Sequence, residues 1–374
     1  MCLEASGTVR VLYLLNYAGA GGIEKYVENL VRLGPGAGIE PYFAYSIAGP
    51  LCDKLAALGV PALRLSLEWK DALRAAGTLA EHCRREGIEV IHTQCPRENI
   101  IALLARRRLQ SLRVVFTDHF TRRVGLPWRL LYWHFTPENH RCIAVCRESR
   151  EVMLANGVDP SRLTVIYNGI EPGPEPVHSE ALRRELGVGP ETLLLLCVAR
   201  FTPEKGLPFL IRSLAALRAK TERPFCCAVA GEGEQLEEIK ALIAQLGLER
   251  EVRLLGYRRD VPELMAGADL FVCPSESEAL SFAVLEAMGA ALPLVLTDAG
   301  ANRELAETEP VCGTVVPYGD ADAFAGAVLT LLEEEPLRRR YAAAARRKAV
   351  ERFDLRRLAL DVFQTYHAKT IKQK

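Results

Sequence analysis

Short apolar runs alternate with amphipathic segments along the first half of the chain. Apolar positions at helical spacing mark helices at 23–33, 51–58, 99–107 and 147–156. The continuous apolar runs between them lie at 9–15, 42–47, 90–93, 114–117, 142–145 and 164–167. Strands that alternate with helices in this way predict a parallel, doubly wound sheet with both faces covered.

A second series of the same kind follows a segment rich in proline and glycine. The segment 168–180 has little that could pack, so residues 171–180 are interpreted as a linker. Since 374 residues exceed one ordinary core, we expect two domains, at 1–170 and 181–354. Helices are expected at 235–246, 321–334 and 355–370, and strands at 193–198, 225–230, 252–254, 270–273, 294–297 and 314–316.

Charge and cysteine content narrow the class of protein. The formal net charge is zero, with 47 basic and 47 acidic residues. The basic excess between residues 97 and 150 is modest and no nucleic-acid motif accompanies it, so a nucleic-acid partner is not expected.

The 11 cysteines lie in apolar elements, as expected for free thiols in a reducing cytosol. No apolar run approaches the ~20 residues that span a bilayer, so we expect a cytoplasmic protein.

Two carboxylates flank a predicted turn between a buried strand and a helix. Glu278 and Glu286 lie in the segment 273–289, CPSESEALSFAVLEAMG, at the expected carboxyl end of a parallel strand. Carboxylates there repel phosphate and accept hydrogen bonds from hydroxyls, and a sugar nucleotide carries both groups. The alternative is a solvated Glu278 and a surface ion pair of Glu286.

Two cations follow the first predicted strand of the second domain. Arg200 and Lys205 lie in the loop VARFTPEKGLP, where they could clamp a diphosphate. Gly206 would shape the turn into the next helix. The alternative is a surface salt bridge with Glu204.

The first domain offers weaker signals. Gly21 and Gly22 follow the first strand, where a helix N-terminus favours negative charge, although a plain tight turn is as consistent with them. The glycine spacing does not fit a dinucleotide site. His119, in FTDHF, follows another strand, and a lone histidine there is more often a packed residue than a catalyst.

The segments 198–208 and 273–289 resemble the motifs of retaining, nucleotide-sugar-dependent glycosyltransferases of family four. The resemblance covers most of the chain and is strongest at 193–317 and weakest at 40–87. It implies the GT-B fold, in which two Rossmann-like domains face each other across a cleft. It also implies that the last helix crosses back, so that residues 355–374 complete the first domain.

The resemblance implies roles for individual residues. Arg200 and Lys205 would hold the leaving diphosphate, and Glu278 would hold a hydroxyl of the transferred sugar. His119 would reach the donor sugar near its reacting carbon. Donor contacts are implied for Gly21, Gly22, Leu280, Ser281 and Glu286, the last at the ribose, and Gly231 and Tyr257 would lie near the base, where each could equally belong to a plain turn.

The implied reaction moves a hexosyl unit from a UDP-, GDP- or ADP-sugar to a hydroxyl of a glycan or glycolipid, with retention at the anomeric carbon. It would serve cell-surface polysaccharide or glycolipid synthesis. Fixed cations would stabilise the leaving diphosphate, so no metal and no further cofactor are expected. The alternatives are a sugar-nucleotide 2-epimerase and a non-catalytic nucleotide-sugar-binding protein.

One segment of the basic first domain interleaves cations with aromatic residues. Such a helix can rest on an anionic membrane surface, whereas a core face with solvated arginines is the commoner arrangement. The hypothesis of peripheral contact with the inner face of a membrane depends on Arg122, Arg123, Trp128, Arg129, Tyr132 and Trp133.

Overall fold

The computed structural model describes residues 8–174 and 177–367. The chain divides into two compact units, and each is described by itself. Unit 1 comprises Met1–Gly169 and Leu355–Lys374, and unit 2 comprises Ile170–Asp354. The boundary falls inside the segment rich in proline and glycine, and the last part of the chain belongs to unit 1.

Unit 1 is built on a parallel sheet of seven strands in the order β3-β2-β1-β4-β5-β6-β7. The inner strands are almost completely buried, as their continuous apolar sequences predict. The strands are β1 (Val9–Tyr17), β2 (Ile39–Ile47), β3 (Ala62–Arg64), β4 (Val90–Thr93), β5 (Arg113–Asp118), β6 (Arg141–Ala144) and β7 (Leu163–Val165).

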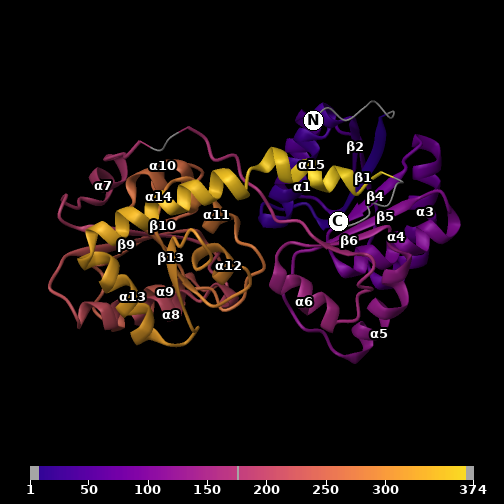
Figure 1. Cartoon of the computed structure of the whole chain (residues 1–374). Coiled ribbons are helices and arrows are strands. Elements are labelled where there is room, and N and C mark those ends of the chain that lie inside the picture. The colour runs from indigo at the N-terminus through magenta and orange to yellow at the C-terminus, as the bar shows by residue number, and fades with distance from the viewer. Residues whose placement is uncertain (1–7, 175–176, 368–374) are drawn as a thin grey trace. The chain divides into compact units, whose positions relative to one another are not determined.

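Helices cover this sheet. Leu12 and Leu14 of β1 pack in one apolar cluster with residues of α3 and α4. Helices α1 and α15 lie side by side (Figure 1). The helices of unit 1 are α1 (Gly22–Leu33), α2 (Pro50–Ala57), α3 (Ala72–Glu86), α4 (Pro96–Arg108), α5 (Leu126–Phe135), α6 (Arg147–Ala155) and α15 (Leu355–Gln364), with short 3-10 turns at Pro35–Ala37, Trp69–Asp71 and Thr136–Glu138.

Unit 2 has the same kind of architecture, with six parallel strands in the order β10-β9-β8-β11-β12-β13. Alternate residues of β8, Leu193, Leu195 and Cys197, pack in one cluster with α8, α9 and α13. The strands are β8 (Leu193–Val198), β9 (Phe225–Ala230), β10 (Val252–Gly256), β11 (Leu270–Cys273), β12 (Leu294–Thr297) and β13 (Gly313–Val316).

The helices of unit 2 lie on both faces of its sheet (Figure 1). Helix α8 packs against α9 and α13, and α11 packs against α14. These helices are α7 (Ala181–Leu186), α8 (Leu207–Arg218), α9 (Leu236–Gln245), α10 (Val261–Gly267), α11 (Phe282–Gly289), α12 (Asn302–Ala306), α13 (Ala321–Glu333) and α14 (Glu335–Arg352), with a 3-10 turn, η4, at Pro203–Lys205.

The two doubly wound sheets confirm the predicted fold class. Two elements between residues 40 and 87, β3 and α3, were not predicted. Strand β3 has three residues at the sheet edge, too few to show a period. Helix α3 has a clear apolar face, built from four alanines with Leu79 and Cys83, and it was overlooked. The last helix was predicted to reach residue 370, but α15 ends at Gln364, and residues 368–374 lie outside the described part of the chain.

Candidate active site

Two loops of unit 2 come together at the centre of its sheet. Strands β8 and β11 are neighbours, although β9 and β10 separate them in sequence. The loop with Arg200 and Lys205 follows β8, and the loop with Glu278 follows β11. Because the order of the strands reverses between β8 and β11, both loops leave the sheet at its topological switch point, where open parallel sheets bind ligands.

The structure joins two of the predicted catalytic residues directly. Lys205 Nζ lies 2.6 Å from Glu278 Oε1, and the two side chains are only 18% and 10% exposed. Ser275 Oγ donates to the same Glu278 oxygen at 2.8 Å. A carboxylate held by an ammonium group and a hydroxyl has a fixed orientation.

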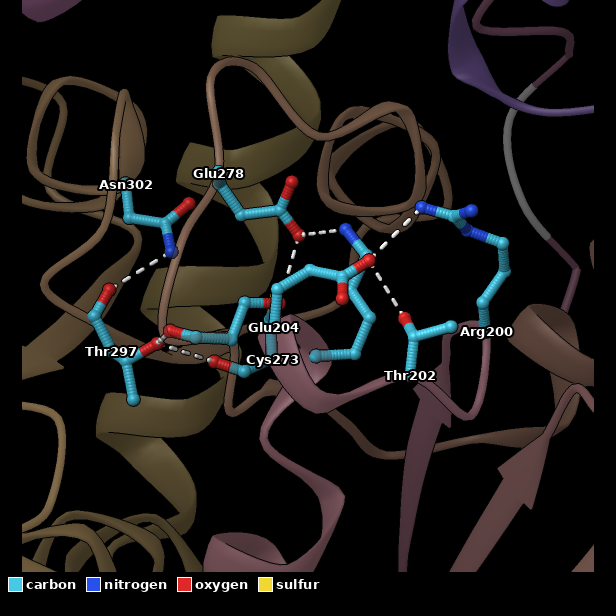
Figure 2. Close-up of polar contacts among 9 residues, drawn as sticks. Arg200, Thr202, Glu204, Cys273, Glu278, Thr297 and Asn302 are labelled. Atoms are coloured by element: carbon cyan, nitrogen blue, oxygen red, sulfur yellow. Dashed lines mark hydrogen bonds and ion pairs between the residues drawn. The ribbon is translucent and has the colours of Figure 1, made fainter. Parts of the chain in front are cut away.

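Further polar residues support this pair from β11 and β12 (Figure 2). Thr297, the last residue of β12, donates to the carbonyls of Ser275 and Cys273. Asn302 Nδ2 donates in turn to the carbonyl of Thr297 at 2.9 Å. Ser275, Thr297 and Asn302 were not predicted from the sequence. Ser275 could have been found as a small polar residue just after an apolar strand and inside a recognised motif, whereas no local signal marks Thr297 and Asn302.

Arg200 has a different environment from Lys205. Its guanidinium group pairs with Glu204 at 3.1 Å, and its side chain is 67% exposed. Thr202 Oγ1 also donates to this carboxylate, at 2.7 Å (Figure 2). The surface salt bridge that the sequence left open as an alternative is therefore the arrangement that Arg200 adopts, whereas Lys205 turns to Glu278.

Two glycines are required by the backbone around this site. Gly206 has φ +66°, and a Cβ there would lie 2.1 Å from the carbonyl oxygen of Pro274, so glycine lets the two loops approach. Gly231 has φ +144°, and a Cβ there would lie 1.8 Å from the carbonyl oxygen of Ala199. A tight turn thus explains Gly231 by itself. Tyr257, which follows β10, is exposed.

The remaining predicted donor contacts in unit 2 surround the start of α11. Ser281 is the N-cap residue of this helix, and its side chain makes no capping hydrogen bond. Leu280, just before it, is buried. Glu286 is half-buried within α11. These three residues therefore lie in the loop that carries Glu278 and in the helix that follows it.

In unit 1 the glycine pair begins a helix. Gly21 is the N-cap residue of α1, and Gly22 is its first residue. The backbone N–H of Gly21 donates to Glu24 Oε2 at 2.8 Å. A Cβ at Gly21 would lie 2.9 Å from the same oxygen, so the absence of a side chain at Gly21 leaves room for the Glu24 carboxylate.

His119 lies just beyond β5, close to the end of β4. Its Nε2 lies 2.9 Å from Gln94 Oε1, and its ring meets the Tyr26 ring edge-on at 4.8 Å. Burial lowers the pKa of His119 to about 3, so the imidazole is neutral at physiological pH. Burial raises the pKa of the neighbouring Asp118 carboxyl to about 7.

A buried chain of hydrogen bonds runs beneath His119. Tyr366, just after α15, places its hydroxyl 2.6 Å from His92 Nδ1. His92 Nε2 lies 2.7 Å from Thr117 Oγ1, which lies 3.2 Å from the Tyr26 hydroxyl. The chain ends at the aromatic ring that contacts His119, so the C-terminal segment is connected to the predicted catalytic histidine within unit 1.

The segment 122–133, which interleaves aromatic and basic residues, lies partly in the core and partly on the surface. Tyr132 of α5 is buried and packs in the apolar cluster around Phe116, so it is not a surface residue. Leu126, Leu130 and Trp133 of the same helix are 65%, 57% and 70% exposed. Their spacing of four and three residues puts them on one helical face.

The described ranges contain neither a cluster of metal-binding side chains nor a membrane-spanning helix. In residues 8–174 and 177–367, no group of three His, Cys, Asp or Glu side chains could hold a metal ion. Over the same ranges, no helix has the length and apolar character needed to cross a membrane. The cysteines there are free thiols.

Two Rossmann-like units, with a polar loop cluster at the switch point of the second sheet, are the components of the GT-B fold. The family model described as glycosyl transferases group 1 matches residues 178–348, and the model for glycosyltransferase family 4 matches residues 20–173. The chain therefore belongs to the group 1 glycosyltransferases of family 4, and it is an enzyme that transfers hexosyl units.

Named relatives agree with this family. An *Escherichia coli* UDP-Gal:alpha-D-GlcNAc-diphosphoundecaprenol alpha-1,3-galactosyltransferase is 25% identical over 78% of this chain and 79% of its own length. The alpha-maltose-1-phosphate synthase of *Mycobacterium tuberculosis* is 29% identical over 60% of this chain and 62% of its own. The structure of *Anabaena* HepE in complex with UDP has a TM-score of 0.85 at 21% identity, covering 96% and 99% of the two chains.

Proposed function

We propose that the protein is a retaining glycosyltransferase that moves a hexosyl unit from a nucleoside diphosphate sugar to an acceptor hydroxyl. The observation that carries this proposal is the contact between Lys205 and Glu278 at the switch point of unit 2. It puts an ammonium group for the leaving diphosphate beside a carboxylate for a sugar hydroxyl.

In the proposed reaction, the acceptor oxygen forms a bond to the anomeric carbon while the bond from that carbon to the diphosphate oxygen breaks. The electron pair of the broken bond goes to the diphosphate, and a leaving phosphate oxygen takes the proton of the acceptor. Attack on the face that the diphosphate leaves gives retention. Lys205 and Arg200 would stabilise the charge that develops on the diphosphate, so the proposal needs no metal ion.

The roles of the remaining residues follow the same proposal. Glu286 would hold the ribose hydroxyls, and the backbone N–H groups near Leu280 and Ser281 would lie beside the transferred sugar. His119 would contact that sugar as a neutral imidazole, since burial lowers its pKa to about 3.

The acceptor is proposed to be a glycan or glycolipid of cell-surface polysaccharide synthesis. The name of the *E. coli* relative, which specifies a sugar on diphosphoundecaprenol, supports this class. The exposed apolar face of α5, flanked by the exposed Arg122, Arg123 and Arg129, supports peripheral binding to the inner face of an anionic membrane.

A donor screen tests the proposal. Purified protein is incubated with UDP-, GDP- and ADP-sugars, binding is followed by the shift of the melting temperature, and the anomeric proton of the product is followed by NMR. We expect one nucleotide series to stabilise the protein, and turnover with a membrane-lipid extract as acceptor source to give the donor's own anomeric configuration.

Two control reactions sharpen this screen. Turnover should persist in EDTA, and a loss that a divalent ion restores would contradict the metal-free reaction. A donor converted to its 2-epimer without any acceptor would contradict glycosyl transfer and favour the epimerase alternative.

A further inference from the structure

A chain of hydrogen bonds connects Glu278 with the strand next to its own. Strand β11, which precedes Glu278, pairs with β12, and this ladder ends at Cys273. The next residue is Pro274, which has no N–H to continue the ladder. At this point the hydroxyl of Thr297, the last residue of β12, donates to the carbonyl of Ser275 and lies 3.3 Å from that of Cys273. A side-chain hydroxyl therefore holds the turn where the backbone pairing ends.

The hydroxyl of Ser275 connects this turn to the Glu278 carboxylate. Ser275 Oγ donates to Glu278 Oε1 at 2.8 Å and lies 3.4 Å from Cys273 Sγ. A carboxylate only accepts, so the single hydroxyl hydrogen of Ser275 points to Glu278, and the thiol of Cys273 donates to Ser275 Oγ. Because Ser275 is completely buried, bulk solvent does not compete for these bonds. The orientation of the Ser275 side chain is thus fixed from both sides.

These contacts distinguish the two oxygens of Glu278. Lys205 Nζ and Ser275 Oγ both bind Oε1. Among the residues that the structure describes, none makes a hydrogen bond or ion pair with Oε2, and the second oxygen of Glu278 carries no contact in Figure 2. This oxygen is not sealed from solvent, although the side chain is only 10% exposed. Oε2 is therefore the oxygen that can accept a hydrogen bond from a ligand hydroxyl.

The loop after β12 also holds the other end of this turn. Gly300 has φ +54°, and a Cβ there would lie 2.4 Å from the carbonyl oxygen of Glu278, so glycine lets the two segments approach. The N–H of Ala301 donates to the carbonyl of Ala279 at 2.8 Å. The end of β12 and its loop thus fix the backbone on both sides of Glu278, at Ser275 and at Ala279.

We infer that Thr297 is a positioning residue of the transfer reaction, which acts through Ser275 to present Glu278 Oε2 to a hydroxyl of the transferred sugar. Thr297 is completely buried, so it contacts no ligand itself. Its own backbone is held by pairing with β13 and by Asn302 Nδ2, which donates to its carbonyl at 2.9 Å. The inference rests on the proposed function, because it takes Glu278 for the residue that binds the transferred sugar.

The first test removes only the hydroxyl. Thr297→Val has nearly the same shape but no donor, so the turn should loosen and Glu278 should move. With the UDP-, GDP- or ADP-sugar that turns over in the donor screen, we expect kcat to fall about tenfold or more. Thr297→Ser keeps the hydroxyl and should stay within about threefold of the unaltered protein. Thr314→Val, the same substitution at a half-buried position of β13, is the matched control and should keep its kcat.

Two further measurements show whether Thr297 acts through Ser275 and on the sugar. The shift of the melting temperature with UDP, GDP or ADP should be nearly the same in Thr297→Val as in the unaltered protein, because these nucleotides lack the sugar that Glu278 binds. An intact shift also shows that the variant is folded. In Ser275→Ala protein, the added Thr297→Val should cause almost no further loss of kcat, because both residues belong to one chain of hydrogen bonds.

Four results would overturn the inference. They are an unchanged kcat of Thr297→Val, an equal loss in Thr297→Ser, additive losses in the double variant, and a lost nucleotide shift, which would mean that the hydroxyl supports the whole unit rather than the carboxylate. If the unaltered protein transfers no sugar from any donor, the proposed function itself fails. Turnover by the unaltered protein together with one of the four results contradicts the role of Thr297 alone.

Discussion

At the scale of single residues, Glu278 shows how one carboxylate is prepared for a ligand. Lys205 and Ser275 both bind its Oε1 atom, which fixes the plane of the carboxylate. Binding costs less when the receiving group is already ordered, because no further side-chain entropy is lost. In our account, this fixed carboxylate selects a sugar hydroxyl at the transferred unit.

Asp118 gives a prediction for pH dependence. Burial raises its pKa to about 7 in the folded protein, against about 3.9 in an unfolded chain. The folded state therefore holds this proton more tightly, so the contribution of Asp118 to stability is full below about pH 4 and is lost as the pH rises through 7. In Asp118→Asn protein this loss should be absent, a difference of up to about 1.4 kcal/mol per pH unit between the two pKa values.

The measurement is the melting temperature of both proteins between pH 4 and pH 8. The unaltered protein should lose stability relative to Asp118→Asn as the pH rises. The exposed Asp53, changed to Asn, is the control and should follow the unaltered protein. Parallel curves for the unaltered and Asp118→Asn proteins would contradict the assignment.

At the scale of elements, the segment after α15 reaches the predicted catalytic region of unit 1 through hydrogen bonds. Tyr366→Phe removes the partner of His92 Nδ1 in a fully buried site. The loosened His92 and Thr117 should let Tyr26 and His119 shift. We expect kcat to fall about tenfold or more, because small displacements of positioning groups are costly, while the donor KM stays nearly constant.

Steady-state kinetics of Tyr366→Phe and of Tyr341→Phe, a half-buried tyrosine of α14 in unit 2, check this prediction. The second variant should keep its kcat. A lower melting temperature of Tyr366→Phe with unchanged kcat would show that the hydrogen-bond chain serves stability alone.

The exposed apolar face of helix α5 gives a prediction for membrane binding. Leu130 lies between Leu126 and Trp133 on the exposed apolar face. Leu130→Glu replaces about 1.5–3 kcal/mol of apolar burial in the membrane interface with a repelled charge, so vesicle binding should fall at least about tenfold. Flotation with phosphatidylglycerol vesicles measures it, and Leu246→Glu, at an exposed leucine of unit 2, is the control.

If α5 contacts the membrane, only the Leu130→Glu protein loses flotation. If the unaltered protein itself does not float, or if both variants behave alike, the proposed membrane face is wrong.

At the scale of the whole molecule, short buried inner strands were the most predictable elements. The runs at β4, β8, β9, β11 and β12 have the predicted bounds because both faces of an inner parallel strand must be apolar. The edge strand β3 has only three residues, too few for such a pattern. Lys205 and Glu278 could be predicted because they lie in short recognisable motifs.

The partners of the motif residues could not be predicted in this way. Thr297 and Asn302 approach Ser275 only because β11 and β12 pair in the sheet. A cavity of about 430 Å³ in unit 1 likewise has Trp69, Glu98 and Trp128 in its walls, residues that are distant in sequence and belong to no recognised motif. Such constellations depend on tertiary contacts that no local spacing encodes.

The central claim is that Lys205 binds the leaving diphosphate beside Glu278. The most direct test is kcat/KM for sugar transfer by Lys205→Ala protein, with Lys220→Ala, a partly exposed lysine of unit 2 paired with Asp322, as control. The account predicts a loss of about 100-fold or more for Lys205→Ala, as for other removed transition-state donors, and almost no loss for Lys220→Ala. A Lys205→Ala protein that works within about threefold of the unaltered protein would contradict it.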